Sequence, residues 1–507
     1  MQNKKLLTLG LGLSCCLGHA AGKQSPNIVY IMADDLGYGD IACYGQPYIH
    51  TPNIDRLATK GMRFTQAYTG SPVSAPARAT LMTGQHTGHT EVRANKPYWG
   101  NFPTMKYGVH DEPTRVGNHP YSPDHVLLPE ILKDNGYTTA MFGKWGGGYE
   151  GSSSTPDKRG FDDFYGYICQ MQAHLYYPNF LNKYSRSDGD TGVVRITLEE
   201  NVKHAMFGPD YYNRTEYSAD LIHQHAIDWI KKQDHRKPFA VFLTYTIPHA
   251  ELVQPQDSIV ESYKNKGDFF IDKTWGGKPK DRYNASINTH AQFAAMVSRL
   301  DTYVGQIIET LDFKGLSDNT LVIFTSDNGP HNGGGADREF FGRDVPIRGI
   351  KLDCLEGGIR IPFIAYWPGK IAEGAVSDHQ LAFYDIMPTF CELAGVKNYI
   401  RKYQNKKTTD YFDGISFLPT LLGEPEKQQK HPFLYWELCQ SNQIGVRVDD
   451  WKLVVTKGKS ALYDLSKDLR EDIDLSRQHP DIVNKLVDIV YQEHVESPLF
   501  KVTLPQR

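Results

Sequence analysis

Short, continuously apolar runs recur along the first three quarters of the chain and predict the strands of a buried sheet. They cover residues 27–33, 137–142, 239–245, 320–325 and 363–367 and are rich in β-branched and aromatic residues. Runs this short that are apolar at every position are typical of strands covered on both faces, as in a parallel sheet.

Segments with the apolar spacing of amphipathic helices lie between these runs. The clearest cover residues 51–58, 128–133, 218–232 and 294–311, and another begins at Asp385. Because strands alternate with helices, we expect an α/β fold whose central sheet is mainly parallel and flanked by helices.

The pattern changes after about residue 432, where short strand-like runs follow one another without intervening helices. These runs cover residues 433–436, 443–448, 451–455 and 461–465, and a helical segment follows at 481–493. They predict a smaller C-terminal antiparallel sheet closed by a helix. We therefore expect a catalytic α/β domain over residues 24–400, a linker over 401–431 and a C-terminal subdomain over 432–507.

The N-terminus has the pattern of a secretion signal. Lys4 and Lys5 precede an apolar segment at 6–17, and Gly18-His19-Ala20 provides small residues for cleavage. The apolar segment is too short for a stable membrane span. We expect a signal peptide over residues 1–20 and a periplasmic or secreted protein. The alternative is a lipid anchor, although Cys15 before Cys16 fits a lipoprotein box poorly.

Composition excludes several other classes. The chain has 507 residues, a net charge of −4, 40% hydrophobic and 22% charged residues, so no basic field favours nucleic acid. Beyond the signal peptide the cysteines are odd in number, widely spaced and without a C-x-x-C motif. This pattern indicates free thiols rather than a disulfide scaffold or a zinc site.

Acidic pairs follow two of the predicted strands. Asp34 and Asp35 come directly after the first strand, and Asp327 and Asn328 come after the fourth. Adjacent carboxylates repel each other unless a cation lies between them. Oxygen ligands without cysteine favour Ca²⁺, with Mg²⁺ as the second choice, and argue against Zn²⁺.

Cationic and nucleophilic residues occur at comparable places. Ser74 suits the N-cap of a helix in which Arg78 lies one turn further on, and a helix start attracts anions. Lys144 and His249 follow the second and third strands. Because ligands bind outside the carboxyl ends of such strands, these residues predict a site for a tetrahedral oxyanion ester. They do not separate sulfate from phosphate.

The stretch 74–84, S-A-P-A-R-A-T-L-M-T-G, resembles the signature of the type I, formylglycine-dependent sulfatases of the alkaline-phosphatase-like superfamily, in its serine form. The other segments resemble the family in family order, from Asn27 to the C-terminal sheet. They are Asp34-Asp35, residues 51–58, Gly143-Lys144-Trp145, Pro248-His249, Asp327-Asn328-Gly329, and residues 348–362 with Lys351.

This resemblance implies a role for each matching residue. Ser74 would be oxidised to Cα-formylglycine by an anaerobic, radical-type maturase, and Arg78 would steady the hydrated aldehyde. Lys144 and Lys351 would bind the sulfate, and His249 would protonate the leaving oxygen. The metal would be held by Asp34, Asp35, Asp327 and Asn328 together with residue 74.

One position departs from the family pattern. The family reads G-K-W-H where this chain has Gly146 in place of the histidine. Sulfatases with this form often carry a Gln-x-Gln-Ala-His segment, which matches residues 170–174 here. We therefore hypothesise that His174 takes the place of the missing histidine near the aldehyde hydrate. A structural role for this histidine is the competing interpretation.

The resemblance implies a sulfatase that hydrolyses a sulfate ester of a carbohydrate, with galactose or N-acetylgalactosamine favoured. One alternative is a phosphodiesterase or phosphonate hydrolase of the same superfamily. Another is a non-catalytic glycan-binding protein in which Ser74 is not oxidised. Sequence alone does not define the sulfate position or endo against exo action.

Overall fold

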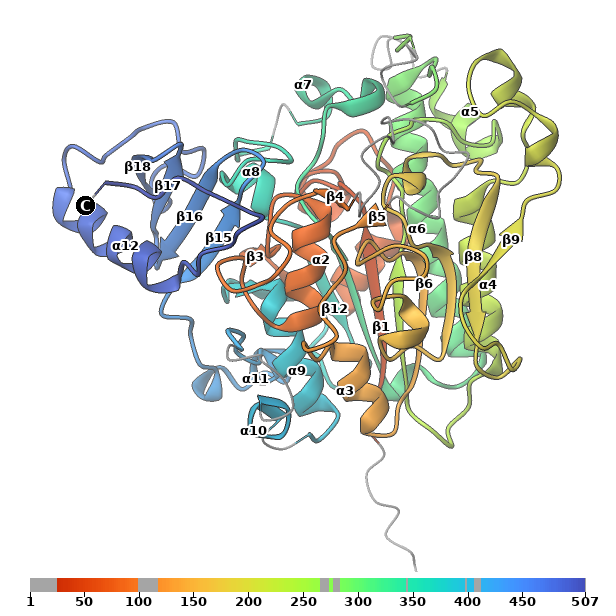
Figure 1. Cartoon of the computed structure of the whole chain (residues 1–507), viewed down its shortest axis with the longest axis horizontal. Helices are drawn as coiled ribbons and strands as arrows, with labels where there is room; N and C mark the ends of the chain where they lie inside the picture. Colours follow the sequence, from red (N-terminus) through yellow and green to blue (C-terminus); the bar gives the residue numbers. More distant parts are fainter. Residues whose placement is uncertain are drawn as a thin grey trace, which may run out of the picture.

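The computed structural model describes residues 25–98, 117–264, 273–276, 283–342, 345–396, 399–404 and 412–506. The predicted signal peptide, including the lipid-anchor alternative, lies outside the described residues. Part of the predicted linker also lies outside them. Figure 1 shows a large α/β body and, at one side of it in blue, a smaller sheet with its own helix.

Four predicted strands lie side by side at the centre of a ten-stranded sheet. They are β11 (Thr320–Ser326), β1 (Asn27–Ala33), β10 (Phe239–Thr244) and β6 (Thr138–Lys144), all parallel. Every residue of β1, β10 and β11 is buried, as expected for strands covered on both faces. The mainly parallel sheet is therefore confirmed.

The outer strands bring in antiparallel pairs. The predicted strand at 363–367 forms β12 (Phe363–Tyr366) and runs antiparallel to β11. The sheet order is β13-β2-β12-β11-β1-β10-β6-β7-β8-β9. The remaining strands of this sheet are β2 (Met62–Phe64), β13 (Ala375–Ser377), β7 (Asp163–Tyr167), β8 (Phe180–Ser185) and β9 (Val194–Thr197). Two short pairs lie outside it: β3 (Ala67–Tyr68) with β14 (Leu381–Ala382), and β4 (Pro97–Tyr98) with β5 (Gly117–Asn118).

Helices cover both faces of the sheet. Successive residues of a strand point to opposite faces, so alternate residues of β1 join two different cores. Val29 and Ile31 join one core with α1 (Pro52–Lys60), α4 (Ser218–Lys232) and α6 (Thr289–Phe313). Tyr30 and Met32 join the other core with the helices α2 (Ser74–Thr83), α3 (Leu128–Asp134) and α9 (Ile386–Leu393). Shorter helices are α5 (Ser258–Lys264), α7 (Arg338–Phe341), α8 (Glu356–Ile359), α10 (Tyr399–Gln404) and α11 (Leu418–Leu421).

The C-terminal subdomain is the antiparallel sheet that the sequence predicts. Its strands β15 (Leu434–Leu438), β16 (Gln443–Val448), β17 (Trp451–Thr456) and β18 (Lys459–Asp464) pair in chain order, and α12 (Pro480–Glu493) packs on them. Buried contacts join this sheet to the catalytic domain. The Trp436 indole N–H donates to the Thr69 carbonyl at 2.7 Å, and the buried Lys452 ammonium lies 2.9 Å from the Glu356 carboxylate.

The prediction of free thiols can be compared with the structure. Cys43, Cys169, Cys354, Cys391 and Cys439 are free thiols, which confirms that prediction. Among the residues that the structure describes, no helix combines the length and the apolar character that crossing a membrane requires.

Candidate active site

The two acidic pairs meet at the carboxyl ends of β1 and β11. Because these strands are parallel neighbours, Asp34 and Asp35 emerge beside Asp327 and Asn328. The Asp327 backbone N–H donates to the Ala33 carbonyl at 3.0 Å, and the Asp35 N–H donates to Asp327 Oδ1 at 3.1 Å. All four of the acidic-pair side chains are buried. The sequence prediction that these residues converge agrees with this geometry.

Ser74 lies at the first residue of α2 and faces this acidic group. Its Oγ lies 3.3 Å from Asp34 Oδ1 and 3.3 Å from Asn328 Oδ1, and its single O–H can donate to either oxygen. The N-cap position itself belongs to Val73, so the expectation that Ser74 caps the helix is wrong. The structural reason is that Asn95 Oδ1 accepts the Ala75 N–H at 2.8 Å. The Ser74 hydroxyl is thereby left to contact Asp34 and Asn328.

Three cationic side chains surround the acidic group. Arg78 donates to Asp327 Oδ2 at 2.9 Å and to the Lys144 carbonyl oxygen at 2.7 Å. The Lys144 ammonium pairs with Asp34, and Lys351 Nζ lies 2.8 Å from Asp35 Oδ2. Arg78 and Lys144 are each only 1% exposed, so these charges act in a medium that screens them weakly.

The electrostatics of the two aspartates differ. Burial, and then the charge of Asp327, raise the pKa of Asp34 to about 6. Burial also opposes ionisation of Asp35, but Lys351 and His249 hold its pKa well below the usual range. Burial lowers the pKa of Lys144, although Asp34 favours its charged form. Burial and the neighbouring Asp327 charge therefore oppose ionisation of Asp34, even though Lys144 and Arg78 lie beside it.

This donor set fits a hard divalent cation. Asp34, Asp35 and His249 each place one ligand atom within 4.8 Å of the others. The Asn328 amide oxygen and Asp327 complete a group dominated by oxygen donors, the ligands that Ca²⁺ and Mg²⁺ prefer. A bound cation would favour the ionised form of Asp34 and so lower its raised pKa.

His249 lies after β10 and completes the side of the site near Lys351. Its Nδ1–H donates to the Ala250 carbonyl, which leaves Nε2 facing Lys351 Nζ at 3.1 Å and Asp35 Oδ2 at 3.3 Å. Burial, and then the charge of Lys351, hold the pKa of His249 well below its usual value. Without a bound anion, this imidazole is therefore neutral at neutral pH.

The structure places His174 against His249. The two rings stack with centroids 4.7 Å apart and planes 15° apart. Position 146, where the family has its histidine, lies in a different environment. A Cβ built at Gly146 would lie 3.4 Å from Arg78 Cδ and 3.6 Å from Gln170 Oε1. Gln170, fixed by a 3.1 Å hydrogen bond from the Asn118 amide, is a site residue that the sequence reasoning missed. The sequence did contain a signal for Gln170, because it is the first glutamine of residues 170–174, the segment on which the hypothesis for His174 is based.

Gly146 adopts a left-handed backbone conformation with φ of +72°, which glycine tolerates best. We expect Gly146→Ala to lower the free energy of unfolding by about 1 kcal/mol through the backbone alone, because its Cβ meets only ordinary contacts. Gly143→Ala is the matched comparison, since its Cβ would lie 2.0 Å from the Thr244 carbonyl oxygen. Denaturant titration should show a far larger loss for Gly143→Ala, and equal losses would contradict this account.

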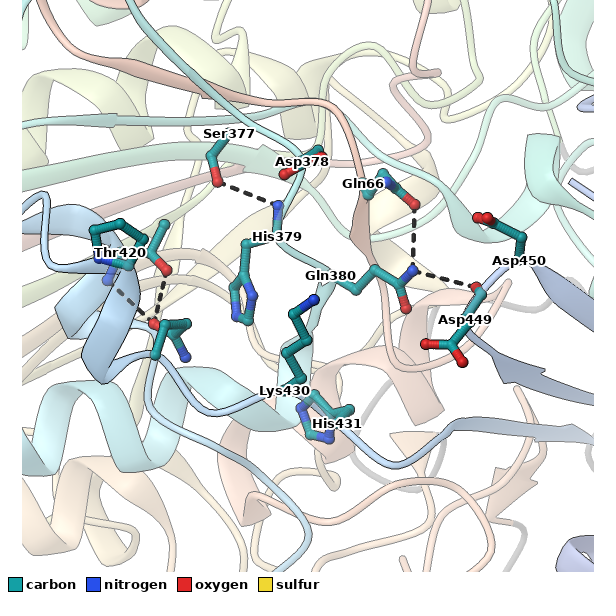
Figure 2. Close-up of a pocket in the computed structure, with 12 residues that line it drawn as sticks. Gln66, Ser377, Asp378, His379, Gln380, Thr420, Lys430, His431, Asp449 and Asp450 are labelled. Carbon is teal, nitrogen blue, oxygen red and sulfur yellow. Dashed lines mark hydrogen bonds between the residues drawn. The ribbon is translucent and has the colours of Figure 1, made fainter. Parts of the chain in front are cut away.

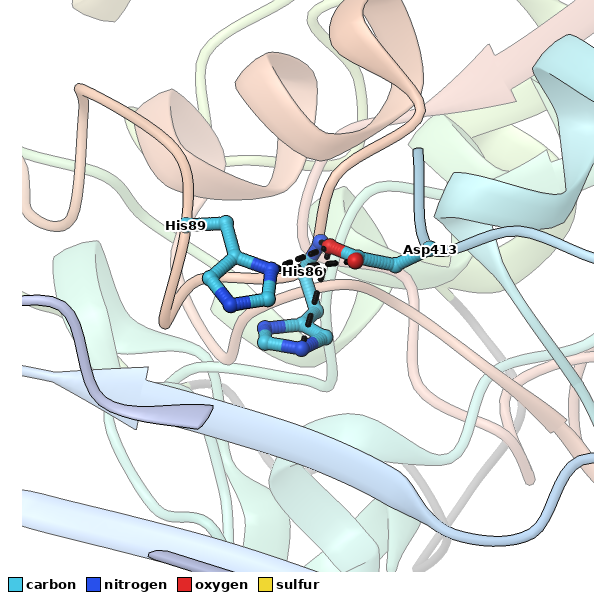
Figure 3. Close-up of side chains that lie close together, drawn as sticks. All are labelled: His86, His89 and Asp413. Carbon is cyan, nitrogen blue, oxygen red and sulfur yellow. Dashed lines mark hydrogen bonds and ion pairs between the residues drawn. The ribbon is translucent and has the colours of Figure 1, made fainter. Parts of the chain in front are cut away.

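A second group of titratable side chains lies where α2 ends (Figure 3). His86, His89 and Asp413 approach one another closely enough to hold a metal ion, and Glu493 lies 3.2 Å from His86 Nε2. However, His86 Nδ1 accepts the Gly88 N–H at 3.1 Å, so a neutral ring carries its proton on Nε2, toward Glu493. The two imidazoles also stack 4.1 Å apart. This geometry favours a hydrogen-bonded cluster that ties the loop after α2 to α12.

The hydrogen-bonded interpretation of this cluster predicts the effect of Asp413→Asn. Asp413 accepts the His86 backbone N–H at 2.8 Å and lies 2.9 Å from His89 Nδ1. Removing its charge should lower the free energy of unfolding by about 1–3 kcal/mol, measured by denaturant titration. The metal content of the purified protein should stay unchanged. A loss of one bound metal per chain in the variant would contradict the hydrogen-bonded interpretation.

A separate cavity of about 400 Å³ is lined by residues of the catalytic domain, the predicted linker and the C-terminal subdomain. Figure 2 shows these lining residues. His379 and Gln380 line one part, Lys430 and His431 another, and Asp449 and Asp450 belong to the C-terminal subdomain. None of the residues lining it is a predicted site residue. It is therefore distinct from the site at the strand ends.

A buried serine at a helix start, buried oxygen donors and three cationic side chains, all gathered near the carboxyl ends of parallel strands, fit a hydrolase for tetrahedral oxyanion esters. The sulfatase family model matches residues 26–396, so the chain belongs to the sulfatase family. It is a sulfuric ester hydrolase of the type I sulfatases in the alkaline-phosphatase-like superfamily. Residues 352–496 match the model described as N-sulphoglucosamine sulphohydrolase, C-terminal.

Individual relatives support this assignment. The N-acetylgalactosamine-6-sulfatase of Rattus norvegicus is 32% identical over 80% of this chain and 67% of its own length. An uncharacterised sulfatase of Schizosaccharomyces pombe is 28% identical over 93% of this chain and 94% of its own. The crystal structure of Ps i-CgsB superimposes with a TM-score of 0.71 at 25% identity, covering 95% of this chain and 96% of that one.

Proposed function

We propose that this sulfatase hydrolyses a sulfate ester of a carbohydrate through a Cα-formylglycine formed at Ser74. The observation that supports this most directly is the position of Ser74 Oγ, 3.3 Å from both Asp34 and Asn328 at the start of α2. Arg78, Lys144 and Lys351 supply the positive charge that a bound sulfate needs. A hydrated, oxidised residue 74 would supply two hydroxyls on one carbon, one to attack sulfur and one to expel sulfate afterwards.

The cation is Ca²⁺ in this proposal, with Mg²⁺ as the second choice. Asp34, Asp35, Asp327 and Asn328 would hold it together with residue 74, and all four offer oxygen. When bound, it would favour the ionised hydroxyl at residue 74 and share the negative charge of the sulfate oxygens. The raised pKa of Asp34 without a cation supports this assignment.

The side chains have separate tasks in this proposal. Arg78 is held by Asp327 and by the Lys144 carbonyl oxygen, and its guanidinium would steady the hydrated aldehyde at residue 74. Lys144 and Lys351 neutralise the sulfate oxygens. His249 gives a proton from Nε2 to the departing sugar oxygen. The negative charge of bound sulfate, and the movement of Lys351 toward it, would favour the protonated imidazole.

His174 remains a proposed partner of the aldehyde hydrate. Its stacking on His249 places it beside the imidazole that acts on the leaving oxygen. If His174 contacts the reacting groups, His174→Ala should slow turnover, and unchanged turnover would end the hypothesis.

Removal of the cation should abolish turnover. We expect EGTA treatment to lower sulfate release by at least about a hundredfold, because the hydroxyl at residue 74 and the sulfate would lose their main positive partner. Added Ca²⁺ should restore the rate better than Zn²⁺, since the donors are hard oxygens. Full activity in metal-free protein, verified by elemental analysis, would contradict the assignment.

The substrate class is supported by names among the relatives. The rat relative is named for N-acetylgalactosamine 6-sulfate, and Ps i-CgsB has also been crystallised with k-i-k-neocarrahexaose. We propose a sulfated sugar based on galactose or N-acetylgalactosamine, met in the periplasm or outside the cell after removal of residues 1–20. A lipid anchor is the alternative, and an anaerobic-type maturase would be the partner that oxidises Ser74.

Sulfate release from a panel of sulfated monosaccharides and disaccharides tests this proposal. The panel should vary galactose, N-acetylgalactosamine and N-acetylglucosamine and the sulfate position, with protein coexpressed with the maturase. Release from a galacto-configured member is expected. Faster cleavage of phosphate or phosphonate esters would favour the phosphodiesterase alternative. Binding of sugars without any hydrolysis, and with Ser74 unoxidised, would favour a glycan-binding protein.

A further inference from the structure

A row of neighbouring rings, which meet edge-on or tilted, extends outward from His249. The Tyr283 ring centroid lies 6.3 Å from that of His249 and 5.6 Å from that of His174. The Trp275 ring follows, 6.0 Å from Tyr283. Tyr283 and Trp275 are both partly exposed, whereas His249 is buried. The row therefore leads from the catalytic centre toward the surface.

The backbone that carries Trp275 is held on several sides. Trp275 and Ser286 exchange two backbone hydrogen bonds of 2.8 and 2.9 Å. Ser286 Oγ in turn donates to the Leu252 carbonyl at 2.7 Å. On the other side, a Cβ at Gly335 would lie only 2.9 Å from Trp275 Cβ. The backbone and Cβ of Trp275 are therefore held beside the loop that follows Asn328.

Tyr283 also lies close to the anion-binding part of the site. A Cβ at Gly333 would meet the Tyr283 ring at 3.7 Å and His331 Nδ1 at 3.1 Å, so Tyr283 packs on the loop that carries His331. The His331 ring stacks on His249 with a centroid distance of 5.3 Å. Tyr283 thus lies beside the imidazole that, in the proposed function, protonates the leaving oxygen.

This arrangement constrains where the leaving sugar lies. Its departing oxygen must be within about 3 Å of His249 Nε2 for proton transfer. The ring that bears this oxygen is then adjacent to the side chains that flank His249. A pyranose has an apolar face of C–H groups, and aromatic faces attract such partly positive hydrogens. In galacto-configured sugars the axial 4-hydroxyl leaves one face with an uninterrupted set of C–H groups.

We propose that Trp275 and Tyr283 form an aromatic platform that binds the pyranose ring of the leaving sugar next to His249. This inference rests on the proposed function and adds to it the contact surface for the sugar. The platform selects a leaving group with an apolar ring face, while Lys144 and Lys351 bind the sulfate whatever it is attached to.

Isothermal titration calorimetry on the Ser74→Ala protein tests the platform without requiring oxidation or turnover. The probes are N-acetylgalactosamine 6-sulfate, galactose 6-sulfate and inorganic sulfate. At least one sulfated sugar should bind more tightly than inorganic sulfate. Adding Trp275→Ala should weaken its binding by about tenfold and leave the affinity for inorganic sulfate unchanged. Trp275→Phe should restore most of the loss.

Trp451→Ala is the matched control, because Trp451 is also partly exposed but lies in the C-terminal subdomain, where its ring is tilted against that of His479 at a centroid distance of 5.0 Å. The Trp451→Ala change should alter neither the affinity for the sulfated sugar nor the affinity for inorganic sulfate. Unchanged inorganic sulfate binding also shows that the Trp275 variant is folded. Tyr283→Leu should weaken sulfated-sugar binding in the same direction as Trp275→Ala.

Two results would overturn the platform. One is equal affinity of the sulfated sugars with and without Trp275. The other is that no sulfated sugar binds more tightly than inorganic sulfate. Failure of the proposed function looks different: matured wild-type protein would release no sulfate, while the Ser74→Ala protein still bound sulfated sugar through Trp275.

Discussion

Ser74→Ala is expected to lower sulfate release by at least about ten-thousandfold, because alanine removes the side chain from which the proposed covalent nucleophile is formed. The side chain removed is small, and its Oγ makes only the two 3.3 Å contacts to Asp34 and Asn328. The free energy of unfolding should therefore change little. Steady-state sulfate release measures the loss of turnover, and denaturant titration of the same preparations measures the change in the free energy of unfolding.

A matched control for this change is Ser262→Ala, which removes an exposed hydroxyl that bonds only the Ile259 carbonyl within α5. It should retain full activity. If Ser74→Ala kept more than a few per cent of wild-type turnover, a serine-derived nucleophile would be excluded, and the site would have to act through a metal-activated water.

Arg78→Ala is expected to have the second largest effect, on stability as well as on activity. Arg78 is 1% exposed and is the 2.9 Å partner of the fully buried Asp327. In metal-free protein, removing it leaves the buried Asp327 carboxylate without its ion-pair partner, which should cost about 3–5 kcal/mol of unfolding free energy. Turnover should fall by about a thousandfold, because residue 74 loses the group that orients it.

Arg236→Ala provides the comparison, since it breaks an exposed pair with Asp234. Exposed pairs are screened by water, so neither stability nor turnover should change measurably. Arg78→Lys separates charge from geometry. It keeps the positive charge but cannot bond both Asp327 and the Lys144 carbonyl, so it should recover stability more than turnover. Equal stability losses for the Arg78 and Arg236 variants would contradict the buried-pair account.

The parts of the site that could be predicted from sequence are those carried by strand ends. The acidic pairs after β1 and β11 had to meet, because parallel neighbours end at the same edge of a sheet. The same rule applied to Lys144, the last residue of β6, and to His249 just beyond β10. Periodicity also predicted the C-terminal sheet, because its strands pair in chain order with short turns.

The remaining parts depend on loops whose paths periodicity does not determine. Gln170 reaches the space beside Gly146 through a loop after β7, and Trp275 reaches the site through a bridge to Ser286. The cluster of His86 and His89 is completed by Glu493, which lies far away in the sequence. Such contacts are decided by tertiary packing. Local patterns gave only indirect signals, such as the glutamines that precede His174.

The domain limits and the roles of individual residues stay predictions that experiments must decide. The role of residue 74 is the one on which the others depend. Arg78, the cation ligands and the sulfate-binding lysines are all assigned relative to a nucleophile at the start of α2.

The most direct test is the mass of the tryptic peptide that spans residues 64–78, taken from protein that releases sulfate. The account predicts a peptide two hydrogens lighter than the serine form, which also reacts with a hydrazide because it carries an aldehyde. A fully active preparation whose peptide keeps the mass of unmodified serine would contradict the account.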